Sequence, residues 1–151
     1  MSKHQEQIIA AAKGKLDEEV VAAVFAKPRG STTAAAGGGM FAREIGAQWS
    51  GKHRKGAEAA GIEVGNPGAV ALTATSLVTM KVKVSLMGAI KDVEDVLSVV
   101  PLGAIDGLEV KRMGAAGVME ITAGGATFKL EGKAGDMKDF AAAFERAKQT
   151  A

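Results

Sequence analysis

Residues 117–132, GVMEITAGGATFKLEG, alternate apolar and polar side chains on both sides of a glycine pair. Alternation with a period of two is typical of a strand with one buried face, and two glycines between such runs indicate a tight hairpin. The chain then changes to the helical period at 136–150, DMKDFAAAFERAKQT, where Phe140 and Phe144 fall on one apolar stripe. Together these residues predict two antiparallel strands that lead into an amphipathic C-terminal helix, with Asp136 as its N-cap.

The same alternation extends from this hairpin toward the N-terminus. It is clear in LEVK at 108–111 and in VKV at 82–84. Short turn signals separate the runs, among them ATS at 74–76 and the glycine-bounded 114–117, so neighbouring runs are expected to pair antiparallel. The predicted strands are 69–75, 77–84, 93–102, 108–113, 117–122 and 126–132.

Before the turn signal NPG at 66–68 the pattern is largely helical. Residues 1–16 carry an apolar side chain at every fourth position and predict an amphipathic helix. Length and flanks favour a first buried strand for VVAAVFAK at 20–27, stopped by Pro28, although periodicity alone also fits a continuation of the helix. Residues 31–62 predict a glycine-rich helical insertion after that strand.

Several segments match one known pattern of apolar positions and turns. They are EEVVAAVFAK at 18–27, VALTATSLVTMKV at 70–82, VVPLGAIDGLEV at 99–110, GVMEITAGGATFKLEG at 117–132 and MKDFAAAFERA at 137–147. These segments resemble the bacterial pleckstrin-homology-like (PH-like) family, small proteins of unassigned function. The resemblance implies an α+β fold in which a strongly bent antiparallel sheet of about seven strands is closed by the C-terminal helix. The resemblance also implies that this chain has relatives that assemble into ring-shaped oligomers.

The composition limits the class of protein. The chain has 151 residues, enough for one domain with a real core. Its net charge of +2 is too small and too dispersed for a nucleic-acid-binding surface. It has no cysteine, which excludes disulfides and thiolate sites and fits a reducing compartment. The polar N-terminus does not have the form of a secretory signal, and no apolar run is long enough to span a bilayer, so we expect a cytoplasmic protein.

The most unusual stretch is 37–56, GGGMFAREIGAQWSGKHRKG. Its apolar residues recur every four positions, and a basic group follows the single tryptophan. Its glycines lack the spacing of a phosphate-binding loop, so we expect it to pack on the fold or on a neighbouring subunit, or to lie on an anionic membrane. The candidate partner or membrane surface consists of Met40, Phe41, Ile45, Trp49, Lys52, Arg54 and Lys55.

Candidate groups for catalysis, metals and cofactors are few. His4 and His53 are not in a metal-ligand spacing. Asp92, Glu94 and Asp95 are close together and could bind a hard cation, but a solvated position at an edge or loop explains them better. No nucleophile has a histidine and an acid in a known pattern. The sequence therefore predicts a protein that is not an enzyme and needs no cofactor.

Two functional classes remain, with no nucleic-acid partner in either. The first is an interaction or assembly module that self-associates or binds a protein partner, by strand addition at an open sheet edge or by helix packing. The second is a peripheral membrane module that uses 37–56. A PH-like phosphoinositide site is not expected, because the residues after the first strand, KPRG at 27–30, lack the family's basic motif. A small apolar ligand inside the curved sheet is a minor third alternative.

Overall fold

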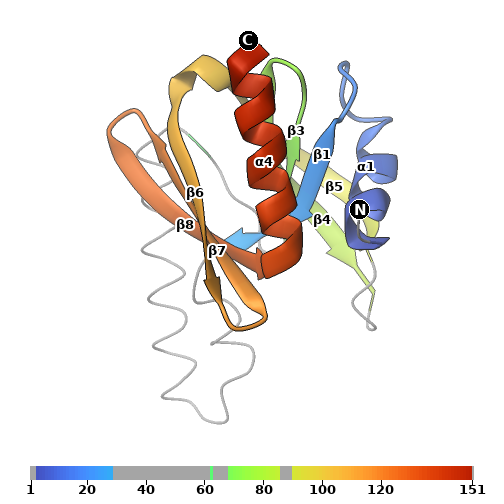
Figure 1. Cartoon of the computed structure of the whole chain (residues 1–151). Coiled ribbons are helices and arrows are strands. Elements are labelled where there is room, and N and C mark those ends of the chain that lie inside the picture. Colours follow the sequence, from blue (N-terminus) through green and yellow to red (C-terminus); the bar gives the residue numbers. More distant parts are fainter. Residues whose placement is uncertain (1–2, 29–61, 63–67, 86–89, 151) are drawn as a thin grey trace.

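A computed structural model describes residues 3–28, 62, 68–85 and 90–150 (Figure 1). The described elements are two α-helices, one short 3-10 helix and eight strands, some of them very short. In chain order they are α1 (Lys3–Ala12), β1 (Ala22–Phe25), β2 (Lys27–Pro28), β3 (Gly68–Leu72), β4 (Ser76–Val84), β5 (Ile90–Pro101), η1 (Leu102–Ala104), β6 (Ile105–Met113), β7 (Ala116–Ala123), β8 (Ala126–Lys133) and α4 (Ala134–Thr150).

The strands form two antiparallel sheets, not the single bent sheet that the sequence predicted. Sheet A has the order β1-β3-β4-β5, and sheet B has the order β2-β8-β7-β6. Two of the passages from sheet A to sheet B lie in the described residues, one at Ala26 between β1 and β2 and the other at η1 between β5 and β6. The α+β class, the strand pattern and the closing helix are as expected. At each of these two passages the chain stops pairing with one set of strands and begins to pair with the other, so the strands form two sheets.

The first passage also corrects the prediction that Pro28 stops the first strand. The N–H of Ala26 still bonds to the carbonyl of Gly68 in sheet A, at 3.0 Å. One residue later Lys27 pairs with Glu131, and Pro28 pairs with Leu130, both in sheet B. Proline is tolerated there because β2 is the outer strand of sheet B, where a missing N–H need not break a ladder.

Two glycines let the chain pass this close to sheet B. A Cβ at Gly132 would lie 2.4 Å from the carbonyl oxygen of Phe25, closer than real Cβ contacts allow. A Cβ at Gly117 would lie 2.9 Å from the Cα of Ala134, at the start of α4. Gly117 and Gly132 are direct partners across β7 and β8. This glycine pair therefore lets both the β1–β2 crossing and the first turn of α4 lie close against sheet B.

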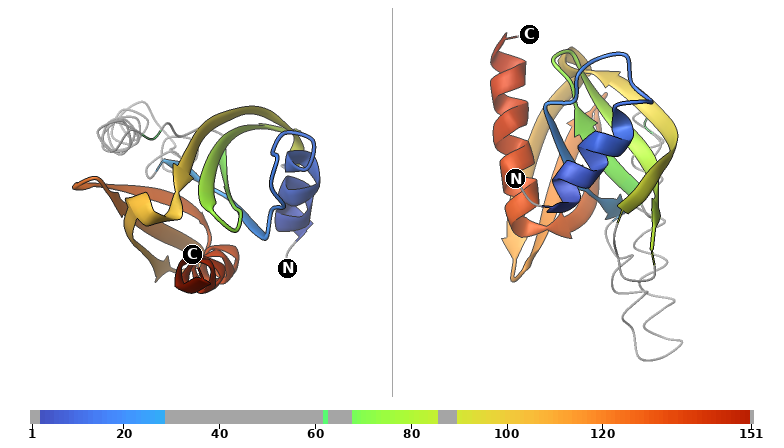
Figure 2. Two further views of the ribbon diagram at one scale, coloured as in Figure 1. Left: turned by 90° about the horizontal axis from the view of Figure 1, so that it is seen from above. Right: turned by 90° about the vertical axis from the view of Figure 1, so that its right-hand side faces the viewer.

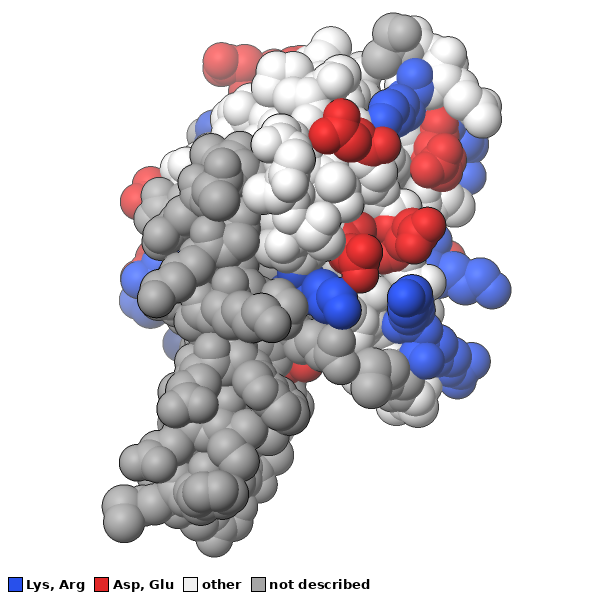
Figure 3. Space-filling view, turned by 90° about the vertical axis from the view of Figure 1, so that its left-hand side faces the viewer, with Lys and Arg blue, Asp and Glu red and all other residues white. Residues whose placement is uncertain are grey.

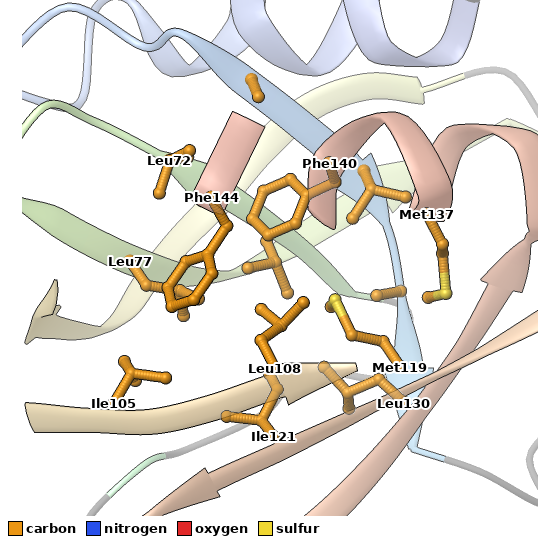
Figure 4. Packing of buried hydrophobic residues seen from close by; sticks show 14 of the residues in the cluster. Leu72, Leu77, Ile105, Leu108, Met119, Ile121, Leu130, Met137, Phe140 and Phe144 are labelled. Atoms are coloured by element: carbon orange, nitrogen blue, oxygen red, sulfur yellow. The ribbon is translucent and has the colours of Figure 1, made fainter. Parts of the chain in front are cut away.

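The larger core lies between the two sheets. Helix α4 covers this core, as the sequence predicted for the C-terminal helix. Phe140 and Phe144 extend from α4 toward both sheets, and their exposed fractions are 0% and 1% (Figure 4). The ring of Phe128 on β8 is also fully buried in this core. The largest non-aromatic members of the core are Ile62, Leu72, Leu77, Leu102, Ile105, Leu108, Met119, Ile121, Leu130 and Met137.

A second core lies between α1 and the other side of sheet A. Ile8 and Ala12 of α1 are fully buried there with Ala23 of β1. Seen from above, β1 passes between α4 and α1, so it separates the two cores (Figure 2, left). The alternating strands of sheet A were expected to expose one face, but β3 is buried at every residue because α1 covers that side.

Several predicted boundaries shift for local reasons. The helix expected at 1–16 ends at Ala12, whose carbonyl accepts the N–H groups of Lys15 and Leu16 in a turn. Asp136 is not an N-cap: it is buried in the first turn of α4, which starts at Ala134. The insertion predicted at 31–62 lies outside the described residues except for Ile62, which is buried in the larger core.

The glycine contact gives a stability prediction. We expect Gly132→Ala to lower the free energy of unfolding by about 1–3 kcal/mol, because the new methyl group must displace backbone at Phe25. The control is Gly107→Ala on β6, where a Cβ meets nothing within 4 Å and the change should stay within about 0.5 kcal/mol. Urea unfolding measures both. Equal stability of the two variants would contradict the close crossing.

Candidate functional site

The surface predicted from 37–56 lies outside the described residues. Neither its helix nor its contacts can be placed, so the roles assigned to this surface stay predictions. The residues concerned are Met40, Phe41, Ile45, Trp49, Lys52, Arg54 and Lys55, together with His53. The candidate sites that can be built are therefore the open edges of the two sheets and the cavities beside them.

The edge of sheet A, strand β5, is irregular along most of its length. Its pairing with β4 shifts between Thr79 and Met80 and twice more farther along β4. Each shift leaves one extra residue on β5, namely Leu97, Glu94 and Lys91. Bulges of this kind bend and twist a strand and are a known way to protect an edge from pairing with another chain. The free side of β5 therefore does not present a regular ladder.

These bulges have a signal in the sequence that the strand prediction missed. Residues 90–101, IKDVEDVLSVVP, carry an apolar side chain at every third position. Ile90, Val93 and Val96 all pack in the second core, and Val99, the next in the series, is 59% exposed. The sequence predicted a strand that begins at residue 93, whereas β5 begins at Ile90.

The edge of sheet B, strand β6, is regular instead. Its pairing with β7 shifts only near its start, between Ile105 and Gly107. The hairpin that follows has two loop residues, because Met113 pairs with Ala116. The pair that closes such a hairpin directs its backbone groups inward, and alternate residues direct theirs outward. Leu108, Val110 and Arg112 therefore direct N–H and C=O to the open side.

A groove lies beside this edge, between β6 and the first turns of α4. Its volume is about 270 Å³, and it is lined by Val110, Arg112, Ala134, Gly135 and Lys138. Helix α4 runs alongside β6 and packs against it (Figure 1). The walls come from one strand and one helix, both of which are rigid elements.

Local contacts fix both walls. The N–H of Ala134 bonds to the carbonyl of Ala115 at 3.1 Å, which anchors the helix start on the β6–β7 hairpin. The Nε of Arg112 donates to the carbonyl of Gly114 at 2.9 Å, which holds the guanidinium at the rim. Val110 is half-buried at the margin of the larger core. The groove therefore has an apolar floor with cations at its rim.

Two other cavities are found. One of about 350 Å³ lies between α1, β1 and α4, and the exposed Val21 forms part of its wall. The other, of about 200 Å³, lies at the open end of the second core, between Leu16, Val78 and Val96. The first lies against β1, an outer strand of sheet A that among the described strands pairs with β3 alone, and the second lies against the bulged β5. The minor alternative of a small apolar ligand stays a prediction.

The acidic residues considered for a cation lie along β5 and are exposed. Glu94 forms an ion pair with Lys81 at 3.7 Å, and the carboxylate of Asp92 accepts the N–H of Val93 at 2.8 Å. Within the part of the chain that the structure describes, no three acidic or histidine side chains are grouped so that they could hold a metal ion. In the same part, neither helix has the length and apolar character needed to cross a membrane.

Comparison with family models, with curated proteins and with solved structures gives no significant match. The function must therefore be argued from the geometry of this chain.

The alternation along β6 makes a prediction about two adjacent exposed cations. Lys111→Pro should lower the free energy of unfolding by about 1–3 kcal/mol, because it removes an N–H that faces β7. Arg112→Pro should cost less than about 1 kcal/mol, because its N–H faces outward at a sheet edge. Urea unfolding of the two variants compares them directly. A larger loss for Arg112→Pro would show that the opposite set of backbone groups is free.

Proposed function

We propose that this chain is a non-enzymatic, PH-like interaction module that receives an extended segment of a protein partner on the open edge of β6. The arrangement of elements supports the PH-like part of the proposal. The N-terminal strand segment runs through both antiparallel sheets, as β1 in sheet A and β2 in sheet B. A C-terminal helix covers the core between the sheets. The closing C-terminal helix agrees with what the resemblance implied, whereas the division into two sheets differs from the single bent sheet.

One observation carries the binding part of the proposal: of the two long outer strands among the described residues, β6 is regular along most of its length, whereas β5 is bulged at every third residue. A segment that adds to β6 would bond with the outward backbone groups of Leu108, Val110 and Arg112. Its alternate side chains would face the groove beside α4. Backbone pairing supplies affinity in this mode, and the groove supplies specificity.

The lining of the groove favours binding over catalysis. Among the residues described, it includes two cations, two apolar side chains and a glycine at the start of a helix. A carboxylate or histidine that could exchange protons with a substrate is not part of this lining.

Self-association through the same edge is the second arm of the proposal, because a strand of another copy would satisfy the same backbone groups. The peripheral-membrane alternative depends on 37–56 and stays a prediction from the sequence.

The proposal is tested with a nine-residue peptide of alternating threonine and valine, which is extended and uncharged. We expect its addition to shift the amide resonances of β6 and of the first turns of α4, and to leave those of β5 unchanged. Arg112→Pro should weaken binding several-fold, because it removes an outward donor. The matched control Arg112→Ser loses the charge but keeps the N–H, so it should bind this neutral peptide as the wild type does.

Two results would contradict the proposal. One is a peptide that shifts β5 and not β6. The other is Arg112→Pro and Arg112→Ser variants with equal affinity for the peptide, since the backbone donor would then play no part.

A further inference from the structure

The end of the molecule that carries the β6–β7 hairpin is strongly basic. Residues 111–117 and 133–138 contain four cations and a single carboxylate, Asp136, which is buried. The whole chain has a net charge of only +2, so this end is more basic than the protein as a whole. The cations are Lys111, Arg112, Lys133 and Lys138.

The rest of the visible surface is mixed in sign. In Figure 3, blue side chains gather at the lower right, toward the end that carries this hairpin, and red and blue side chains are interspersed above them. On the outer face of sheet B, Lys129 and Glu120 form an ion pair at 3.7 Å. Arg112 and Lys138 have no such ion pair with a carboxylate of any described residue. Their charge is available to a bound segment.

The apolar and basic side chains of the groove lie one after the other along the path of a bound strand. Successive side chains on one side of a strand are about 7 Å apart, since each residue advances about 3.3 Å. A groove-facing residue next to Val110 would touch the apolar floor. The groove-facing residue two positions along would then lie beside Arg112 and Lys138 at the rim. Glu145, two turns farther along α4, disfavours a second acidic residue at the other end.

We propose that the segment received by β6 is acidic and pairs antiparallel with it, as β7 does on the other side, with an aspartate or glutamate two positions before an apolar residue. This inference depends on the proposed function, and it adds the chemistry of the partner. The apolar side chain occupies the groove over Val110, and the carboxylate pairs with Arg112 and Lys138. Charge complementarity of this kind raises the rate of association and selects the partner.

A separate protein fits this site better than a second copy does. The exposed carboxylates at 92–95 lie on β5, whose bulged outer side does not present a regular ladder, and Glu94 is bound to Lys81. The other acidic run, at 17–19, leads directly into Val20, which is buried in the second core. Among the described residues, neither run is free to extend along another copy's β6.

The test uses the full chain and three fluorescein-labelled nonapeptides of alternating threonine and valine. They differ only two positions before the central valine, where they carry glutamate, glutamine or lysine. Fluorescence polarisation gives the affinities, and amide shifts give the site. We expect the glutamate peptide to bind about 3- to 10-fold more tightly than the glutamine peptide at low salt, and the lysine peptide to bind most weakly. This preference should disappear at about 0.5 M NaCl.

Variants separate the groove from general charge. Arg112→Gln with Lys138→Gln should abolish the preference for glutamate and keep binding of the glutamine peptide. The control, Lys13→Gln with Lys91→Gln, removes the same charge from exposed positions on other elements and should keep the preference.

Each other outcome overturns the inference in a recognisable way. If all three peptides bind equally and shift β6, the acidic partner is wrong and the proposed function stands. If no peptide shifts β6, both are wrong. If light scattering shows a dimer without peptide, and β6 amides shift with protein concentration, the occupant is a second copy.

Discussion

The carbonyl of Phe25 lies against Gly132, and the rest of the structure depends on this contact. Here the first strand leaves sheet A and joins sheet B, and any side chain at 132 would hold the two apart. Because β1 then separates the two cores, it is buried on both sides, one against α1 and the other against α4. The partner of Gly132 across the ladder, Gly117, seats the start of α4. One glycine pair therefore sets both the angle between the sheets and the position of the closing helix.

The position of α4 decides what is left open. Its first turn is anchored on the β6–β7 hairpin, and Lys148 near its end donates to the carbonyl of Ile105 at the start of β6. Helix α4 is thus held along the full length of β6. The outer backbone edge of β6 is not covered by any described element. Sheet A has the opposite arrangement, since its outer strand β5 is curved by repeated bulges. This difference between the outer strands β5 and β6 is the physical basis of the proposed function.

The sequence predicted the elements that depend on neighbours in the chain. The hairpin at 124–125 and the stripe of Phe140 and Phe144 are local patterns, and both hold in the structure. It did not predict the split at Ala26, because the close approach of Gly132 joins residues more than 100 positions apart. The groove was missed for the same reason, since Val110 and Lys138 meet only through the packing of α4 on sheet B. The bulges of β5 were the one non-obvious feature with a local signal, its period of three.

The most direct test of the account is residue-by-residue amide hydrogen exchange along β6 in the free protein. An open, regular edge predicts alternation: the amides of Glu109 and Lys111 should exchange at least about tenfold more slowly than those of Val110 and Arg112, because only the former face β7. Uniformly slow exchange along the strand would mean that this edge is already covered, and would contradict the claim that it is free to receive a partner.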